Sequence, residues 1–368
     1  MREQLDISQR FDLRSRLFAV QTPSVECRIG LSSSLIRYSH CGAVGSNLQE
    51  TLPLFDAPVP ELKAQLSERL RKLAAVDNLF LGTSSWKYEG WLDQIYSPER
   101  YLVKGRCSAK RFEQECLAEY AETFSIVCGD FAFYQFPTPA FWRKLFTQVP
   151  APFQFAFKVP EEITLPVFPS LPRYGLRAGH VNPKFLSSEL IQSQFLDLLS
   201  PFADRISLLI FEFGASIGRA FDGVAGFAEA LSRFFSSLPG AFRYAVEIRQ
   251  TQFLEPEYFS ALHENGVAHV FNSWSEMPGI DEQMRDSEAF TANFTAARAL
   301  LRPGRSYASS LRMFSPYREI REPNEEVRAA LRDLLVRAKR RAEPTFVFVN
   351  NRLEGFAPGT IAAIIDAV

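Results

Sequence analysis

Three observations in this sequence of 368 residues predict an α/β fold, a single (β/α)8 TIM-type barrel with an N-terminal extension. Eight short apolar runs begin at Leu79, and such runs are typical of parallel strands that are buried on both faces. Patterns with helical periodicity separate the runs, as alternating strand and helix units require. Hydrophobic residues make up 46% of the chain, which is enough for a large core.

Residues 1–60 are predicted to be a weakly ordered extension and linker, because they mix Ser, Gly, Arg and isolated apolar residues without a sustained period. A wrongly assigned start codon would give the same pattern. The prolines between Leu52 and Pro60 favour an extended linker. Residues 61–76 then place leucines at intervals of three and four, which predicts an amphipathic helix packed on the barrel.

The barrel is predicted to span residues 79–368 as one domain. Its strands are the runs LFLGTSS, IVCGD, FQFAFK, ISLLIFE, FRYAVEIR, VAHVFN, FTAAR and TFVFVNN. Helices are expected at 107–124, 138–149, 187–199, 222–238, 255–266, 325–342 and 358–368, with weak helical character over 275–288. Thr138 followed by Pro139 predicts a capped helix start. The long connections 161–183 and 300–324 are expected to be lids or binding loops.

Most of the runs end on polar residues, and the carboxyl ends of the strands carry the active site in a TIM-type barrel. Side chains alternate along a strand, so Glu247 and Arg249 face the barrel mouth if Val246 faces the helices. The same alternation turns further ionisable groups inward at Asp130, Lys158, Glu212 and Arg298. A buried unpaired charge is costly, so we expect these groups to pair with one another or with a ligand.

The predicted catalytic residues are Glu247, Lys158, Arg249 and Asp130. A carboxylate beside a fixed guanidinium can move a proton while the cations hold an anionic substrate, so Glu247 is expected to be the general acid or base. Substrate binding is predicted for Trp86, Tyr134, Glu212, Arg298, Asn350 and Asn351, the asparagines through amide hydrogen bonds. The alternative is a purely structural network, in which three carboxylates and three cations neutralise one another at the top of the barrel.

An aromatic stretch, GTSSWKYEGW, follows the first strand. Gly82 permits close backbone approach, and Trp86, Tyr88 and Trp91 can form a stacking wall for a ligand. The same aromatic residues are equally consistent with an ordinary core that covers the barrel.

No metal or cofactor is predicted. The histidines show no ligand spacing, and the chain has neither a P-loop nor a GxSxG elbow. A magnesium site at Asp130, Glu212 and Glu247 would compete with three cations for the carboxylate oxygens. Cys128 is expected to be a buried small hydrophobic residue, and the basic run VRAKRRAEP is expected to be the solvated face of a helix.

Composition argues against recruitment to a polyanion or a membrane surface. The net charge is −1, with 41 basic and 42 acidic residues, so no global field attracts nucleic acid or lipid. Five cysteines without a CxxC pair suggest reduced thiols, and no apolar run has the length of a signal peptide core or a membrane span. The protein is expected to be soluble and cytoplasmic, and its oligomeric state is not predicted.

The segments GTSSW, DFAFYQFPTP, FAFKVPEEIT, YAVEIR and FVNNRLEGFAP resemble the YecE-like proteins, the family called domain of unknown function 72. The resemblance covers about Leu79 to Val368 and implies a TIM-type barrel without an established reaction. The residues that match the family pattern are Lys158, Glu247, Arg249, Arg298, Asn350 and Asn351. The chain departs from that pattern at Cys128, Asp130, Glu212, Gln250 and Leu165.

These features predict a hydrolase or lyase that acts at the barrel mouth on a small anionic substrate, such as a phosphorylated or nucleotide-like compound. The alternative, from a different class, is a non-catalytic protein that binds nucleic acid or nucleotides by stacking bases on the aromatic wall.

Overall fold

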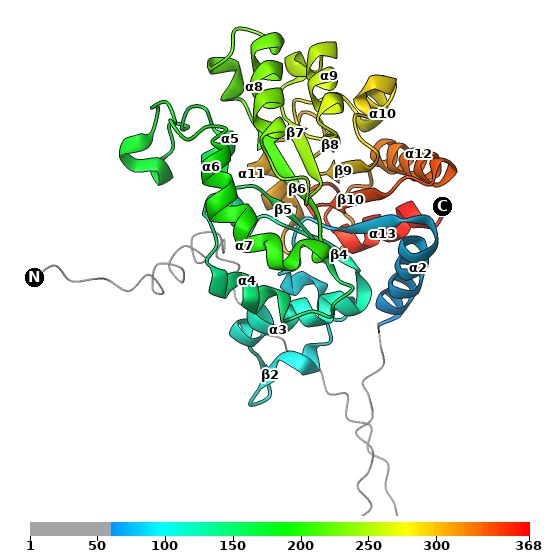
Figure 1. The fold of residues 1–368 in the computed structure, drawn as a ribbon. Helices are drawn as coiled ribbons and strands as arrows, with labels where there is room; N and C mark the ends of the chain where they lie inside the picture. The colour runs from blue at the N-terminus through cyan, green and yellow to red at the C-terminus, as the bar shows by residue number, and fades with distance from the viewer. Residues whose placement is uncertain (1–59) are drawn as a thin grey trace, which may run out of the picture. The chain divides into compact units, whose positions relative to one another are not determined.

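The computed structural model describes residues 60–368, so the extension predicted for 1–60 lies outside the described residues apart from Pro60. The described part is an α/β barrel in which eight parallel strands form one closed sheet surrounded by helices (Figure 1). The strands are β1 (Leu79–Thr83), β4 (Ile126–Gly129), β5 (Gln154–Lys158), β6 (Ile206–Phe213), β7 (Tyr244–Ile248), β8 (Ala268–Ser273), β9 (Thr295–Ala299) and β10 (Thr345–Val349). Each of them overlaps one of the predicted runs, so the predicted fold is confirmed.

The barrel closes between β1 and β4, and its strand order is β1, β10, β9, β8, β7, β6, β5, β4. This seam is short, because Thr83 opposite Val127 is its one register pair. The hydroxyl of Tyr120 bridges the seam: it accepts the N–H of Thr83 at 3.1 Å and donates to the carbonyl of Ile126 at 3.0 Å. A side-chain hydroxyl thus supplements a short backbone ladder.

The predicted alternation of strand side chains is confirmed. Ala156, Ala245 and Phe346 belong to the apolar cluster inside the barrel, whereas Phe155 and Val246 belong to the cluster between the sheet and the helices. Parallel strands that are covered on both faces need apolar side chains on both. Inward-facing polar residues therefore appear where the strands end.

The helices outside the barrel follow the expected order. They are α2 (Glu61–Asp77), α3 (Ala109–Thr123), α4 (Pro139–Phe146), α8 (Val224–Ser236), α9 (Pro256–Glu264), α12 (Glu325–Arg341) and α13 (Ala357–Ile365). In α2, Leu66, Leu70 and Leu73 are buried, as the leucine spacing predicts. The Thr138 hydroxyl accepts the N–H of Phe141 and caps α4, which also confirms the predicted start of that helix.

Two segments differ from the prediction in their local structure. The helix expected over 187–199 is divided into α6 (Ser188–Ile191), a π-helical turn (Gln192–Leu196) and α7 (Asp197–Leu199). The connection at 300–324 contains a helix, α11 (Tyr307–Phe314), that the sequence pattern did not predict. Ser306 caps it by accepting the N–H of Ser309, so a serine N-cap was the available signal within a stretch rich in Arg, Ser and Pro.

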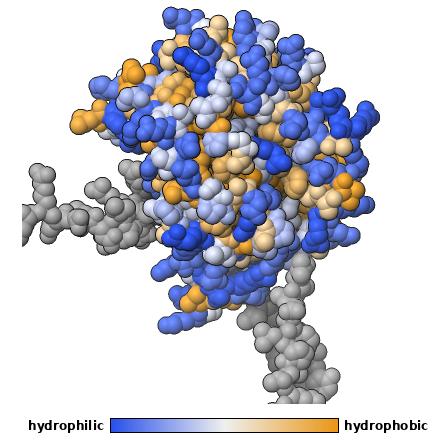
Figure 2. All heavy atoms as spheres, in the orientation of Figure 1, coloured by the Kyte–Doolittle hydropathy of each residue, from blue (hydrophilic) through white to orange (hydrophobic). Residues whose placement is uncertain are grey.

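The connection after β5 starts with the short helix α5 (Glu161–Thr164) and continues through a 3-10 segment, Pro172–Arg177. Its own small cluster of Leu165, Phe168 and Tyr174 holds it together. Most of the face in Figure 2 is hydrophilic, and one hydrophobic patch lies on this protruding connection. The exposed apolar residues there are Leu171, Leu176 and Val181.

Candidate functional site

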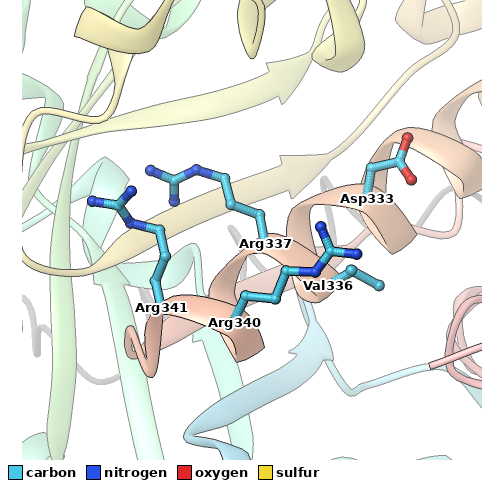
Figure 3. Close-up of a pocket in the computed structure, with 5 residues that line it drawn as sticks. All are labelled: Asp333, Val336, Arg337, Arg340 and Arg341. Carbon is cyan, nitrogen blue, oxygen red and sulfur yellow. The ribbon is translucent and has the colours of Figure 1, made fainter.

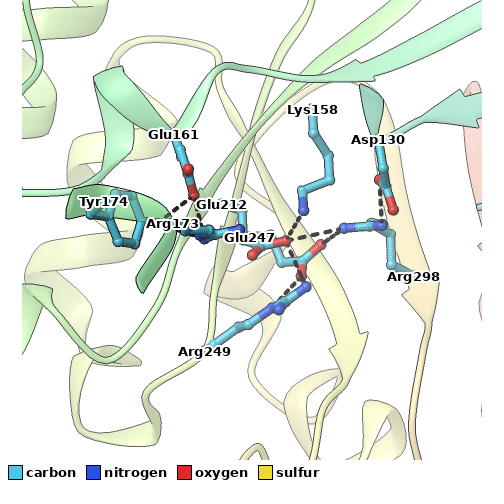
Figure 4. A network of polar contacts seen from close by, with 9 residues as sticks. All are labelled: Asp130, Lys158, Glu161, Arg173, Tyr174, Glu212, Glu247, Arg249 and Arg298. Atoms are coloured by element: carbon cyan, nitrogen blue, oxygen red, sulfur yellow. Dashed lines mark hydrogen bonds and ion pairs between the residues drawn. The ribbon is translucent and has the colours of Figure 1, made fainter. Parts of the chain in front are cut away.

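The candidate site is a network of ion pairs at the carboxyl ends of the strands (Figure 4). Glu247, at the end of β7, lies at its centre with no exposed surface. Its Oε2 accepts from Nη1 of Arg298 at 2.5 Å, and its Oε1 accepts from Nε of Arg249 at 2.8 Å. Both carboxylate oxygens are therefore held by guanidinium groups, one from the end of β9 and one just beyond β7.

Glu212, on β6, pairs with both Arg249 and Lys158 and so connects Lys158 to the ion pairs of Glu247. Its Oε2 lies 2.6 Å from Nη2 of Arg249 and 2.7 Å from Nζ of Lys158. Lys158 also lies 3.6 Å above the ring of Phe133, and a cation over a ring face is a favourable contact. The structure thus brings together the six ionisable residues predicted for the mouth, with three positive and three negative side chains.

Asp130 is the most weakly held member of this set. Its Oδ1 lies 3.4 Å from Nη2 of Arg298, and its side chain is 34% exposed. Arg298 is only 2% exposed and has an Nε–H that makes no hydrogen bond within the described structure. A buried donor without a partner is unusual, so this edge of the network keeps unused hydrogen-bonding capacity.

The electrostatic balance keeps Glu247 ionised. Burial alone would raise its pKa, but Arg298, Arg249 and Lys158 outweigh burial and lower the pKa to about 2. Glu247 is therefore a carboxylate at neutral pH and is a poor proton donor. Cys128 is fully buried beneath the network, and burial raises the pKa of its thiol to about 12, which fits the prediction that it is no nucleophile.

A fourth carboxylate borders the network and was not predicted from the sequence. Glu161, the first residue of α5, accepts from the Tyr174 hydroxyl and from Arg173, each at 2.8 Å. Burial raises the pKa of Glu161, although these two partners oppose the rise. The signal that could have identified it is its place in FAFKVPEEIT, three residues after Lys158, since a buried acid beside a site often carries protons.

Four of the residues predicted to bind substrate lie outside the ion pairs described above. Asn350 and Asn351 are buried, and their side-chain oxygens accept the backbone N–H groups of Arg352 and Ala357. Trp86 is 5% exposed and packs edge-on against Phe131, and Tyr134 is 45% exposed.

The aromatic stretch after β1 is mainly core. Trp91 has no exposed surface and packs against Tyr96, Tyr120 and Phe356. Tyr88 is partly buried and contacts Trp91 with a centroid distance of 4.9 Å. Trp91 therefore cannot form part of the predicted stacking wall, because its ring is enclosed in the core.

One inward-facing residue at the mouth was absent from the prediction. Asn272 is fully buried on β8 and lies in register with Arg298. Its side-chain amide donates to the carbonyls of Ile248 and Val270, and its Oδ1 makes no hydrogen bond within residues 60–368. Asn272 is the last residue of the run VAHVFN, so the rule that found the other strand-end residues could have found it.

A shallow depression on α12 is lined by Asp333, Val336, Arg337, Arg340 and Arg341 (Figure 3). It lies at the end of α12 that leads into β10, away from the carboxyl ends of the strands. Glu343 pairs with Arg337 and Arg341, and Arg337 covers the ring of Phe290. The depression is therefore a basic surface held by local contacts.

The described residues contain no cluster of three or more His, Cys, Asp or Glu side chains arranged to hold a metal ion. Across the same residues, every helix is too short or too polar to span a membrane.

A family model described as a protein of unknown function, DUF72, matches residues 80–368. The chain belongs to the DUF72 family. The UPF0759 protein YecE of Escherichia coli K12 is 26% identical over 197 residues, which cover 52% of this chain and 58% of that protein. YecE of Escherichia coli O157:H7 matches with the same values. The chain thus matches a little over half the length of these DUF72 relatives.

Solved DUF72 structures share the fold. A DUF72 protein of Enterococcus faecalis V583 has a TM-score of 0.54 and 16% identity, with 78% of this chain and 94% of that chain covered. A DUF72 protein of Thermotoga maritima MSB8 has a TM-score of 0.52 and 18% identity, with 78% and 97% covered. At these identities the likeness concerns the DUF72 barrel and not its chemistry.

Proposed function

We propose that this DUF72 protein is an enzyme of the hydrolase or lyase class that binds an anionic, phosphorylated or nucleotide-like compound at the barrel mouth. The observation that carries the proposal is the convergence of Lys158, Arg249 and Arg298 at the strand ends. Cations that are fixed before the substrate arrives stabilise negative charge without reorganisation, which is the largest single contribution in many enzymes.

The cations of the network keep unused hydrogen-bond donors that an incoming anion would engage. Arg298 keeps its Nε–H, and a lysine ammonium has three N–H donors, of which Lys158 directs one to Glu212. Asp130 is the weakest competitor, since its contact with Arg298 is the longest hydrogen bond of the set and its side chain is one-third exposed. A ligand phosphate would therefore replace Asp130 on Arg298 first.

Within this proposal Glu247 holds Arg249 and Arg298 in place, because a carboxylate with a pKa near 2 cannot donate a proton at neutral pH. A carboxylate with so low a pKa is also a weak proton acceptor at neutral pH, so the proposal gives Glu247 a positioning role. Glu161 is the better candidate for proton transfer, since burial raises its pKa toward the working range and Tyr174 orients it.

Thermal denaturation with inorganic phosphate, pyrophosphate, sugar phosphates and nucleotides tests the proposal. A ligand at 100 times its dissociation constant stabilises the folded state by about 2.7 kcal/mol. We expect Lys158→Met to abolish this stabilisation, because it removes one cation while Glu212 keeps Arg249 as a partner. Lys144→Met is the control, since Lys144 is exposed on α4 and should leave ligand binding unchanged. Lack of stabilisation by any of these anions would refute the proposal.

The variant Asp130→Asn tests whether Asp130 competes with the ligand for Arg298 or contacts the ligand itself. If Asp130 only competes with the ligand for Arg298, we expect the variant to bind pyrophosphate about 2- to 5-fold more tightly, because a long, partly exposed ion pair contributes only up to about 1 kcal/mol. Isothermal titration calorimetry at constant ionic strength measures the change. Weaker binding would instead show that Asp130 contacts the ligand directly.

The alternative function of nucleic-acid binding by an aromatic wall finds less support. Trp86 and Trp91 are 5% and 0% exposed, so neither presents a free ring face for stacking.

A further inference from the structure

The barrel mouth has two different halves. The ion pairs gather over β5, β6 and β7, and they are joined by Arg298 from β9 and Asp130 from the end of β4. The other half follows β4, β1, β10 and β9, which are consecutive neighbours in the closed sheet. Each of these four strands is followed by a tyrosine or an arginine at the rim: Tyr134, Tyr88, Arg352 and Tyr307, respectively.

These residues contact one another or lie close together. The guanidinium of Arg352 lies 4.5 Å from the ring centroid of Tyr307, and Tyr88 contacts Tyr317 at 5.5 Å. The ring of Tyr134 contacts Phe133 at a centroid distance of 5.2 Å, and Lys158 lies 3.6 Å above Phe133, which places Tyr134 beside the ion network. Burial raises the pKa of Tyr134, and Tyr307 and Asp130 add to the rise.

Two of the rings are partly open to solvent, although Arg173 lies 5.2 Å from the ring centroid of Tyr134. Tyr134 and Tyr307 are each 45% exposed, although large aromatic side chains are usually much more buried. Arg352 lies over the ring of Tyr307 and has an Nε–H without a hydrogen-bond partner in the described structure. A guanidinium over an aromatic ring forms a planar platform, and exposed rings beside fixed cations suit a ligand that is both flat and anionic.

We propose that Tyr134 and Tyr307, with Arg352, form a subsite for the base of a mononucleotide whose phosphate lies on Lys158 and Arg298. The inference rests on the proposed function, since it assigns the substrate class of the same mouth. A phosphorylated sugar would occupy the charged half alone. A nucleoside phosphate would span both halves, so its ring would add stacking energy to the ion pairs.

The test compares ligands that differ only in the ring. Ribose 5-phosphate, adenosine and the four common nucleoside 5′-monophosphates are titrated into the full chain by isothermal titration calorimetry. We expect at least one nucleotide to bind about 5- to 150-fold more tightly than ribose 5-phosphate, which is the range for stacking of one base. Tyr134→Ala and Tyr307→Ala should remove this advantage and leave the affinity for ribose 5-phosphate unchanged.

Phenylalanine variants are the matched controls. Tyr134→Phe and Tyr307→Phe keep the rings and should keep the preference for nucleotides. Equal affinity for ribose 5-phosphate and all nucleotides would overturn the subsite while leaving the anion site intact. Alanine variants that still prefer the nucleotide would also overturn it. If neither kind of phosphate binds, the proposed function fails together with this inference.

Discussion

Replacing Glu247 by Gln should lower the free energy of unfolding at neutral pH by about 3 to 5 kcal/mol, because it removes the charge that Arg249 and Arg298 share. The side chain keeps its shape, so the loss reports electrostatics rather than a cavity. The midpoint of urea denaturation measures it. Glu229→Gln is the control, since Glu229 is 71% exposed and meets Arg233 only at 3.9 Å, and it should change stability by less than about 0.5 kcal/mol.

The effect of Glu247→Gln should depend on pH in a specific direction. The pKa of Glu247 is lowered from 4.5 to about 2 in the folded state, so its carboxylate stabilises the fold above about pH 4.5. That stabilisation, on the order of 3 kcal/mol, is lost as the pH falls through about 2. The difference between the variant and the wild type should therefore shrink between pH 4.5 and 2. A difference that is the same at pH 7 and pH 2 would contradict the ion-pair explanation.

The role of Glu247 can be assigned by measuring both the free energy of unfolding and the phosphate affinity of Glu247→Gln. A variant with lower stability but normal affinity for phosphate assigns Glu247 to the structure of the mouth. A variant with wild-type stability and no turnover, once a substrate is known, would restore the catalytic role that the sequence predicted.

The barrel and the mouth could be predicted from the sequence because both depend on local patterns. A strand that is buried on both faces has to be apolar along its length, and alternation then determines that Glu247 and Lys158 face inward where it ends. The resemblance of GTSSW and YAVEIR to the DUF72 family predicts the same barrel. These predictions need no knowledge of which strands are neighbours.

The pairing of the charges could not be predicted in the same way. Arg298 reaches Glu247 and Asp130 because the closed strand order places β9, β7 and β4 around one opening, and that geometry exists only in three dimensions. The raised pKa of Glu161 depends on how the connection after β5 folds back over it. Similarly, Trp91 turned out to be core because Tyr96 and Tyr120 enclose it.

Replacing Gly82 by Ala should disrupt closure of the barrel. A Cβ at this position would lie 2.2 Å from the carbonyl oxygen of Ile126, a backbone atom of the neighbouring strand that cannot move aside alone. The close backbone approach expected at this glycine is thus that of β4. Overpacking typically costs 1 to 3 kcal/mol, and we expect about 3 kcal/mol or more here because the clash is with backbone.

The position of the clash explains why it should be so costly. Because β1 and β4 share one register pair, the hydroxyl bridge from Tyr120 to Thr83 and Ile126 carries much of the seam. Separating the strands would break this bridge and leave buried polar groups without partners, which adds its own cost. Gly226→Ala is the control: Gly226 lies in α8 with only an ordinary contact at 3.6 Å, so alanine should be neutral or stabilising by up to about 1 kcal/mol. Urea denaturation of both variants measures the difference, and a Gly82→Ala protein as stable as the wild type would show that the barrel can close without this glycine.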